Sequence, residues 1–98
     1  MATLIAMYKH PEDPAAFDRH HFGVHVPLAR KLPNLTSYDV SHGSIDGGSY
    51  YLVAVLTFSS HEAMTAALQS EAGEAAQQDL ANFAGAGVDI LTYDARPA

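Results

Sequence analysis

The sequence contains no cysteine, which excludes disulfide bonds, thiolate nucleophiles and thiolate metal sites. It also lacks an apolar run long enough to span a membrane, so no membrane association is expected. The first residues carry no basic segment of the kind that opens a signal or transit peptide. A cytoplasmic location is therefore the default expectation.

Basic residues are scarce as well: 5 lysines and arginines stand against 11 acidic residues, and they are dispersed. Such a chain repels phosphate backbones, so nucleic acid is not an expected partner. A glycine-rich dinucleotide turn, a phosphate loop and a Ser-His-Asp spacing are all missing. We therefore expect no built-in cofactor, and any catalysis should depend on proton transfer and on orienting a reactive substrate.

What the chain does contain is typical of one soluble globular domain spanning residues 1–98, because 48% of its residues are hydrophobic. Apolar patterning predicts strands at residues 3–8, 35–41, 50–58 and 88–93. Helix start and stop signals predict a first helix from Pro14 to Pro33, with Asp13 as its N-cap. They predict a second helical region that opens at a Ser59 cap, restarts at Ser70 and breaks at Gly85.

This order of elements, βαββαβ, predicts an α+β, ferredoxin-like fold with a four-stranded antiparallel sheet. The strands at residues 3–8 and 50–58 are apolar on both faces and should be central, whereas the other two carry polar residues typical of edge strands. The two helical regions can cover only one face of such a sheet. A second copy of the chain is the expected cover of the other face, which predicts a homodimer.

The first helix should place its buried stripe on residues at helical spacing, namely Phe17, Val24, Leu28 and Leu32. Pro27 lies inside this pattern and cannot donate to the carbonyl group of Gly23. The helix should therefore bend or loosen between these two residues. His25 lies in the expected bend.

Three histidines on this helix, His20, His21 and His25, are the densest polar feature of the sequence. Histidine changes its charge near neutral pH, and His21 and His25 lie one turn apart beside the buried stripe. They could be packed side chains with satisfied ring nitrogens, or His25 could be a general acid or base beside the loosened turn. A metal site would need further ligands that this pattern does not supply, so no metal is expected.

Two other polar residues have both a structural and a functional interpretation. Tyr38 shares a strand face with Val40, so its phenol could hydrogen-bond a ligand under the first helix, although strand tyrosines usually serve packing. Asn82 either terminates the second helical region or contributes a polar group to a pocket.

Several segments together resemble a known family. They are residues 8–18, residues 20–28 with the specific His25-Val26-Pro27-Leu28 motif, residues 32–38, and the loop from Asn82 to Gly87. These segments are similar to the EthD family, named for a component of tertiary-alkyl ether breakdown. The resemblance implies a dimeric α+β barrel, a superfamily that includes cofactor-free monooxygenases of aromatic polyketides, muconolactone isomerases and polyketide cyclases.

By position, the resemblance makes His20, His25 and Tyr38 the recurrent polar residues of the family. His21 departs from the pattern, because the family prefers a large aromatic residue there. The sequence and the resemblance together predict two groups of site residues. The expected catalytic residues are His25 and His20, and the expected substrate-binding residues are His21, Phe22, Tyr38, Asn82 and Phe83.

The leading hypothesis is a cofactor-independent enzyme that acts by acid/base chemistry on a small, largely apolar metabolite or xenobiotic in an oxidation pathway. The reaction class stays open among monooxygenase, isomerase, cyclase and oxidoreductase. One alternative is a non-catalytic accessory protein that binds such a molecule. Another is an oxidoreductase with an externally supplied cofactor, and a purely structural protein would leave no pocket near His25.

Overall fold

The computed structural model describes residues 1–98, and its elements follow the expected βαββαβ order. The strands are β1 (Ala2–Lys9), β2 (Leu35–Val40), β3 (Tyr50–Phe58) and β4 (Val88–Asp94). The helices are α1 (Pro14–His20), the π-helical η1 (His21–His25), α2 (Val26–Ala29), α3 (His61–Gln69) and α4 (Glu71–Phe83). No helix combines the length and the apolar character that a membrane span requires.

The four strands form one antiparallel sheet in the order β2-β3-β1-β4. This confirms the prediction that β1 and β3 are central and that β2 and β4 are edges. Leu4 lies opposite Leu56, and Ala6 lies opposite Ala54. The ferredoxin-like α+β architecture predicted from the sequence is therefore present.

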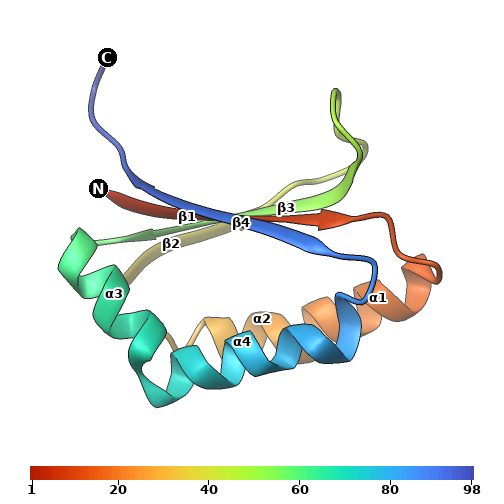
Figure 1. The fold of residues 1–98 in the computed structure, drawn as a ribbon, viewed down its shortest axis with the longest axis horizontal. Coiled ribbons are helices and arrows are strands. Elements are labelled where there is room, and N and C mark those ends of the chain that lie inside the picture. The colour runs from red at the N-terminus through yellow and green to blue at the C-terminus, as the bar shows by residue number, and fades with distance from the viewer.

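All helices lie on one side of the sheet, so the molecule has two layers (Figure 1). Its extents of 36 × 34 × 17 Å agree with this flat shape. The opposite face of the sheet is bare, and the half-buried side chains of Ile5, Met7, Val53 and Val55 lie on it, by strand alternation.

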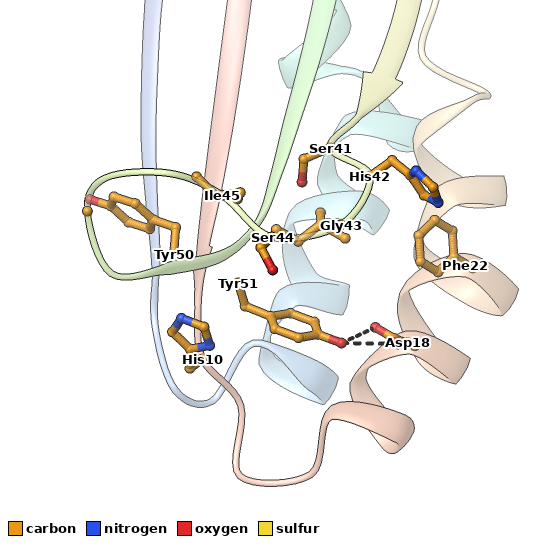
Figure 2. A pocket seen from close by; sticks show the side chains of 12 residues that line it. His10, Asp18, Phe22, Ser41, His42, Gly43, Ser44, Ile45, Tyr50 and Tyr51 are labelled. Atoms are coloured by element: carbon orange, nitrogen blue, oxygen red, sulfur yellow. Dashed lines mark hydrogen bonds between the residues drawn. The ribbon is translucent and has the colours of Figure 1, made fainter.

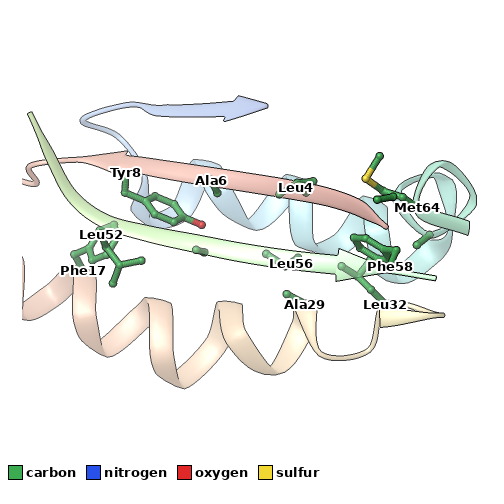
Figure 3. Packing of buried hydrophobic residues seen from close by; sticks show 13 residues of the cluster. Leu4, Ala6, Tyr8, Phe17, Ala29, Leu32, Leu52, Leu56, Phe58 and Met64 are labelled. Atoms are coloured by element: carbon green, nitrogen blue, oxygen red, sulfur yellow. The ribbon is translucent and has the colours of Figure 1, made fainter. Parts of the chain in front are cut away.

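The core lies between the two layers (Figure 3). Alternate residues of the central strands face the helices because successive side chains point to opposite faces. The strands contribute Ala2, Leu4, Ala6, Tyr8, Leu52, Ala54, Leu56 and Phe58. The helical layer contributes Phe17, Ala29, Leu32, Met64 and Ala67.

The buried stripe of the first helical region differs from the prediction. Val24 is 44% exposed and Leu28 is only half-buried, and the stripe instead consists of Phe17, His21, His25, Ala29 and Leu32. A regular helix, with about 3.6 residues per turn, cannot keep residues spaced four apart on one face over this length. The wider π-helical turn η1 corrects the drift, so the histidines replace Val24 and Leu28 in the core.

The loosened turn expected before Pro27 is this π-helical segment. The N–H of Val26 donates to the carbonyl of His21, five residues earlier, as in a π-helix. Pro27 lacks an N–H and cannot restore the regular pattern to Gly23. The prediction of a local irregularity that holds His25 is therefore confirmed.

The helix caps agree with the sequence, with one shift. The side chain of Asp13 accepts from the N–H of Ala16 at 3.1 Å, and Ser70 accepts from Gly73 at 3.1 Å, as expected. Ser60, not Ser59, caps α3 and accepts from Ala63 at 3.0 Å. The cap is one residue later because β3 continues to Phe58 and Ser59 bridges to the extended Ser60.

Candidate functional site

A buried carboxylate, that of Asp79 on α4, brings two of the expected histidines together. His20 Nε2 lies 2.8 Å from Asp79 Oδ1, and His25 Nδ1 lies 3.0 Å from Asp79 Oδ2. The side-chain amide of Asn82 donates to Asp79 Oδ1 at 3.0 Å. Asp79 is 5% exposed, so hydrogen bonds from these groups stabilise its charge more than water does.

Helix geometry explains how these side chains meet. The π-helical turn directs His25 toward the core, while His20 precedes that turn and leans toward α4. On α4, Asp79 lies three residues after the buried Ala76 and four before Phe83, so it shares their inward face. Phe83 packs between the histidines, with ring centroids 5.1 Å from His20 and 4.8 Å from His25.

The hydrogen bonds decide the charge of Asp79 and the tautomers of its partners. Burial alone would raise the pKa of Asp79, but hydrogen bonds from Asn82, His20 and His25 lower this pKa below its ordinary value. Asp79 is therefore ionised at neutral pH and can only accept hydrogen bonds. His20 must donate from Nε2 and His25 from Nδ1, which leaves Nε2 of His25 with a free lone pair.

His25 is neutral as well as oriented. Burial lowers the pKa of His25, and the hydrogen bond to Asp79 offsets only part of this effect. A neutral imidazole that donates from Nδ1 to a carboxylate is arranged to accept a proton at Nε2. The pair of His25 and Asp79 is thus a potential general base.

His25 borders a cavity of about 70 Å³ between the sheet and the helices. Small side chains, including Ala6, Ala54 and Ala76, leave this space. Tyr38 on β2 also lines it, and burial raises the pKa of Tyr38 to about 12, so its phenol stays protonated and able to donate. Ile90 on β4 lines the cavity and is 48% exposed, so the cavity reaches the surface at the margin between β4 and α4.

His21 is completely buried and lines none of these spaces. Neither of its ring nitrogens has a hydrogen-bond partner. Its ring stacks on Phe17 with an interplanar angle of 8° and on His25 with an angle of 26°. Burial, together with the smaller effect of the neighbouring His25, lowers the pKa of His21 to about 4, so His21 is a neutral aromatic ring at pH 7.

A surface groove of about 640 Å³ lies on the other side of the histidines. His20, Asn82 and Phe83 line it, together with residues of the loop that precedes α1. The hydrogen-bonded group of Asp79, His20, His25 and Asn82, here called the Asp79 cluster, therefore lies between two spaces. His25 borders the apolar cavity, and His20 borders the open groove.

A third hollow, of about 540 Å³, lies between α1 and the loop that connects β2 to β3 (Figure 2). A bulge in β3 lets Tyr51 turn toward α1, where its hydroxyl donates to Asp18 at 2.9 Å. Phe22 lines this hollow, lies beside His42 in Figure 2 and is 49% exposed. The hollow is separate from the Asp79 cluster.

The predicted site residues thus fall into four groups. His25 and Tyr38 line the apolar cavity, and His20, Asn82 and Phe83 line the groove. His21 is enclosed, and Phe22 lies at the third hollow. Groups of three or more metal-binding side chains in a suitable arrangement are not found.

Sequence reasoning missed Asp79, which organises the cluster. A signal was present, because helical spacing places Asp79 on the same stripe as the apolar residues Ala76 and Phe83. A carboxylate on a buried stripe needs partners, and helical histidines elsewhere in the chain are suitable ones.

Comparison with known proteins agrees with this architecture. Residues 9–87 match the EthD domain family. An 11.0 kDa protein from the thcB-thcC intergenic region of Rhodococcus erythropolis is 39% identical over 97 residues, which cover 96% of this chain and 94% of that protein.

Solved structures give the same result. An ethyl tert-butyl ether (EthD) family protein from Bacillus halodurans is 35% identical, with a TM-score of 0.89 over 98% of this chain and 99% of that one. SnoaB, a cofactor-independent oxygenase from Streptomyces nogalater, has 16% identity and a TM-score of 0.73 over 99% and 94%. A dimeric ferredoxin-like protein from Jannaschia has 20% identity and a TM-score of 0.69 over 96% and 98%. The match over most of the chain, the 39% identical relative and the shared fold show that this protein belongs to the EthD family.

Proposed function

We propose that this protein is a cofactor-independent enzyme that acts by acid/base chemistry on a small, largely apolar organic molecule. The observation that carries the proposal is the hydrogen bond of 3.0 Å between buried Asp79 and His25, at the border of an apolar cavity. Membership of the EthD family supports a role in small-molecule metabolism. SnoaB, which shares the fold, is a cofactor-independent oxygenase.

In the proposed reaction, Nε2 of His25 accepts a proton from an acidic C–H or O–H group of the substrate. Asp79 holds the ring in the required tautomer and stabilises the imidazolium that forms. The hydroxyl of Tyr38 donates to the oxygen on which negative charge develops. Return of the proton at another position completes an isomerisation. In a cyclisation the carbanion attacks a carbonyl carbon of the same molecule, and the proton returns to the alkoxide that forms. In an oxygenation the carbanion adds dioxygen, the proton returns to the resulting peroxide, and loss of water from this hydroperoxide breaks the O–O bond and leaves a carbonyl group.

The cavity limits the substrate class. About 70 Å³ accommodates the reactive end of a molecule rather than a whole ligand, since ligand pockets usually measure several hundred Å³. We propose that the remainder of the bound substrate extends out of the cavity at the margin beside Ile90. Among the expected binding residues, Tyr38 then makes direct contact, while His21 and Phe83 support the ring of His25.

His20 and Asn82 complete the proposed catalytic cluster from the side of the groove. Both donate to Oδ1 of Asp79, the oxygen that His25 does not use. They hold the carboxylate ionised and in place. Phe22 borders a different hollow, and a contact between Phe22 and substrate would require a ligand that reaches across α1.

The substitution His25→Gln tests the proposal. Glutamine preserves a donor toward Asp79 but cannot accept a proton, so turnover should fall by about a hundredfold or more. Exposed His42, replaced by glutamine, is the matched control and should leave turnover unchanged. Unchanged turnover in His25→Gln would refute the assignment of the base.

The same assay separates the alternatives. Purified protein is incubated with small aromatic and lactone candidates, with and without dioxygen, and with and without added nicotinamide or flavin. Products without any added cofactor support the proposal, and products only with one support an externally supplied cofactor. Ligand-induced shifts at His25 without products support a binding protein that delivers a metabolite to other enzymes.

We also propose that the working form is a homodimer in which two sheets pack face to face into an α+β barrel. The bare face of this sheet carries apolar side chains such as Ile5 and Val55, which one chain alone leaves half-exposed. The ferredoxin-like protein from Jannaschia that shares the fold is dimeric.

A further inference from the structure

One carboxylate serves two histidines in very different surroundings. The side chain of His20 is 27% exposed and lines the surface groove, whereas that of His25 is 8% exposed and lines the apolar cavity. Each histidine donates to its own oxygen of Asp79. The two rings therefore compete for the same negative charge.

We propose that His20 is a positioning residue for His25. Asp79 can compensate the positive charge of one protonated histidine, and His20 takes up that proton. His25 thereby stays neutral. The inference rests on the proposed role of His25 as a proton acceptor and names the residue that regulates it. His20 does not reach the cavity, so it acts on the reaction only through Asp79.

Electrostatics gives the reason. Two imidazolium rings on one carboxylate would leave a net positive charge in a buried cluster, so binding of one proton disfavours binding of the second. The first proton goes to the ring that water can solvate, because burial penalises a charge. That ring is His20, which is more than three times as exposed as His25.

Two carboxylates, Glu12 and Asp13, line the groove together with His20. Their negative charges favour the proton on His20 over one on His25.

The other groups around His25 do not change this result. His21 is a neutral aromatic ring without hydrogen-bond partners, and Phe83 is uncharged. From the sheet, Tyr8 and Tyr38 line the cavity as protonated phenols, because burial raises the pKa of both. Asp79 is thus the one anion bound to His25, and His20 is the titratable competitor for it.

Two substitutions with opposite expected effects test the proposal. His20→Gln removes the titrating ring but keeps a neutral donor, and His20→Lys supplies a permanent charge that reaches the same groove. The pKa of His25 is read from the NMR titration of its ring C2 proton, identified by its loss in His25→Gln. In His20→Gln the titration midpoint of His25 should rise by roughly one pH unit. In His20→Lys it should stay at or below the value in the natural protein.

The contrary results are equally defined. A midpoint in His20→Gln that is unchanged or lower would overturn the proposal, and so would an equal rise in both variants. The natural protein supplies a test that needs no substitution at position 20: the ring of His20 should take up its proton at higher pH than that of His25. The reverse order would overturn the proposal even if a variant failed to fold.

This experiment needs no substrate, so it is independent of the turnover assay. If His25→Gln retains full turnover while the His20 variants shift as expected, the proposed function fails and the charge coupling stands. If His25→Gln is inactive but the titration midpoint of His25 is the same in the His20 variants as in the natural protein, the coupling fails and the proposed function stands.

Discussion

Replacing His21 by phenylalanine should make the protein much less sensitive to mild acid. The ring of His21 is fully buried, and both of its nitrogens lack hydrogen-bond partners. It makes the contacts of an aromatic ring, because it stacks on Phe17 with 5.7 Å between the two ring centroids. Phenylalanine can reproduce this stacking, but it cannot bind a proton.

The magnitude follows from the pKa of His21. Burial lowers this pKa from 6.5 to about 4, whereas the unfolded chain keeps the ordinary value. Between these two values the unfolded state binds more protons, so the free energy of unfolding falls as the pH falls. A difference of about 2.5 pH units, at about 1.4 kcal/mol per unit, amounts to about 3.5 kcal/mol in full. About 3 kcal/mol of this is lost once the pH reaches 4, where His21 of the folded protein is half protonated.

Urea unfolding at fixed protein concentration, at pH 7 and at pH 4.5, measures this loss. The natural protein should lose about 2–3 kcal/mol more than His21→Phe between the two conditions. At pH 7 the variant should be of similar or slightly higher stability, since removing unpartnered polar atoms offsets the larger ring. His42→Gln, on an exposed loop, is the control. Parallel losses in the natural protein and in His21→Phe would refute the reasoning.

Two further substitutions test the remaining proposals. Asp79→Asn keeps the shape of the side chain but removes the charge that orients both histidines, so turnover should fall roughly 10²- to 10⁴-fold at pH 7, measured as kcat with folding checked by circular dichroism. Full turnover in this variant would exclude the pair of His25 and Asp79 as the base. Val55→Asp places a charge at the centre of the bare sheet face and should give a monomer in sedimentation velocity, whereas Ala66→Asp on the exposed side of α3 should not. A dimer that survives Val55→Asp would place the interface elsewhere.

Much of the fold could be predicted because its signals are local. The strand at residues 50–58 has the predicted bounds, and it and β1 are central because both are apolar on both faces. The caps at Asp13 and Ser70 are short-range hydrogen bonds that a sequence pattern reveals. In the predicted stripe of the first helix, Phe17 and Leu32 are buried, but Val24 is exposed and Leu28 is only half-buried. A regular helical period does not hold through this segment, because a π-helical turn precedes Pro27.

The sequence by itself determined the βαββαβ order, the fact that one face of the sheet would stay bare, and the presence of histidines beside a loosened turn. It also identified the chain as similar to the EthD family. Each of these properties depends on neighbouring residues or on spacing within one element. Tyr38 and His25 could therefore be named as candidate site residues from the sequence.

Only the tertiary structure decided which histidines are hydrogen-bonded to the same charged carboxylate. Asp79 lies 54 residues from His25 and 59 from His20 along the chain, and only the packing of α4 beside the first helical region joins them. The structure also decided that His20 borders the groove and His25 the cavity. The physical reason is that hydrogen bonding and burial set the protonation of these side chains, and both arise from contacts between elements that no local pattern encodes.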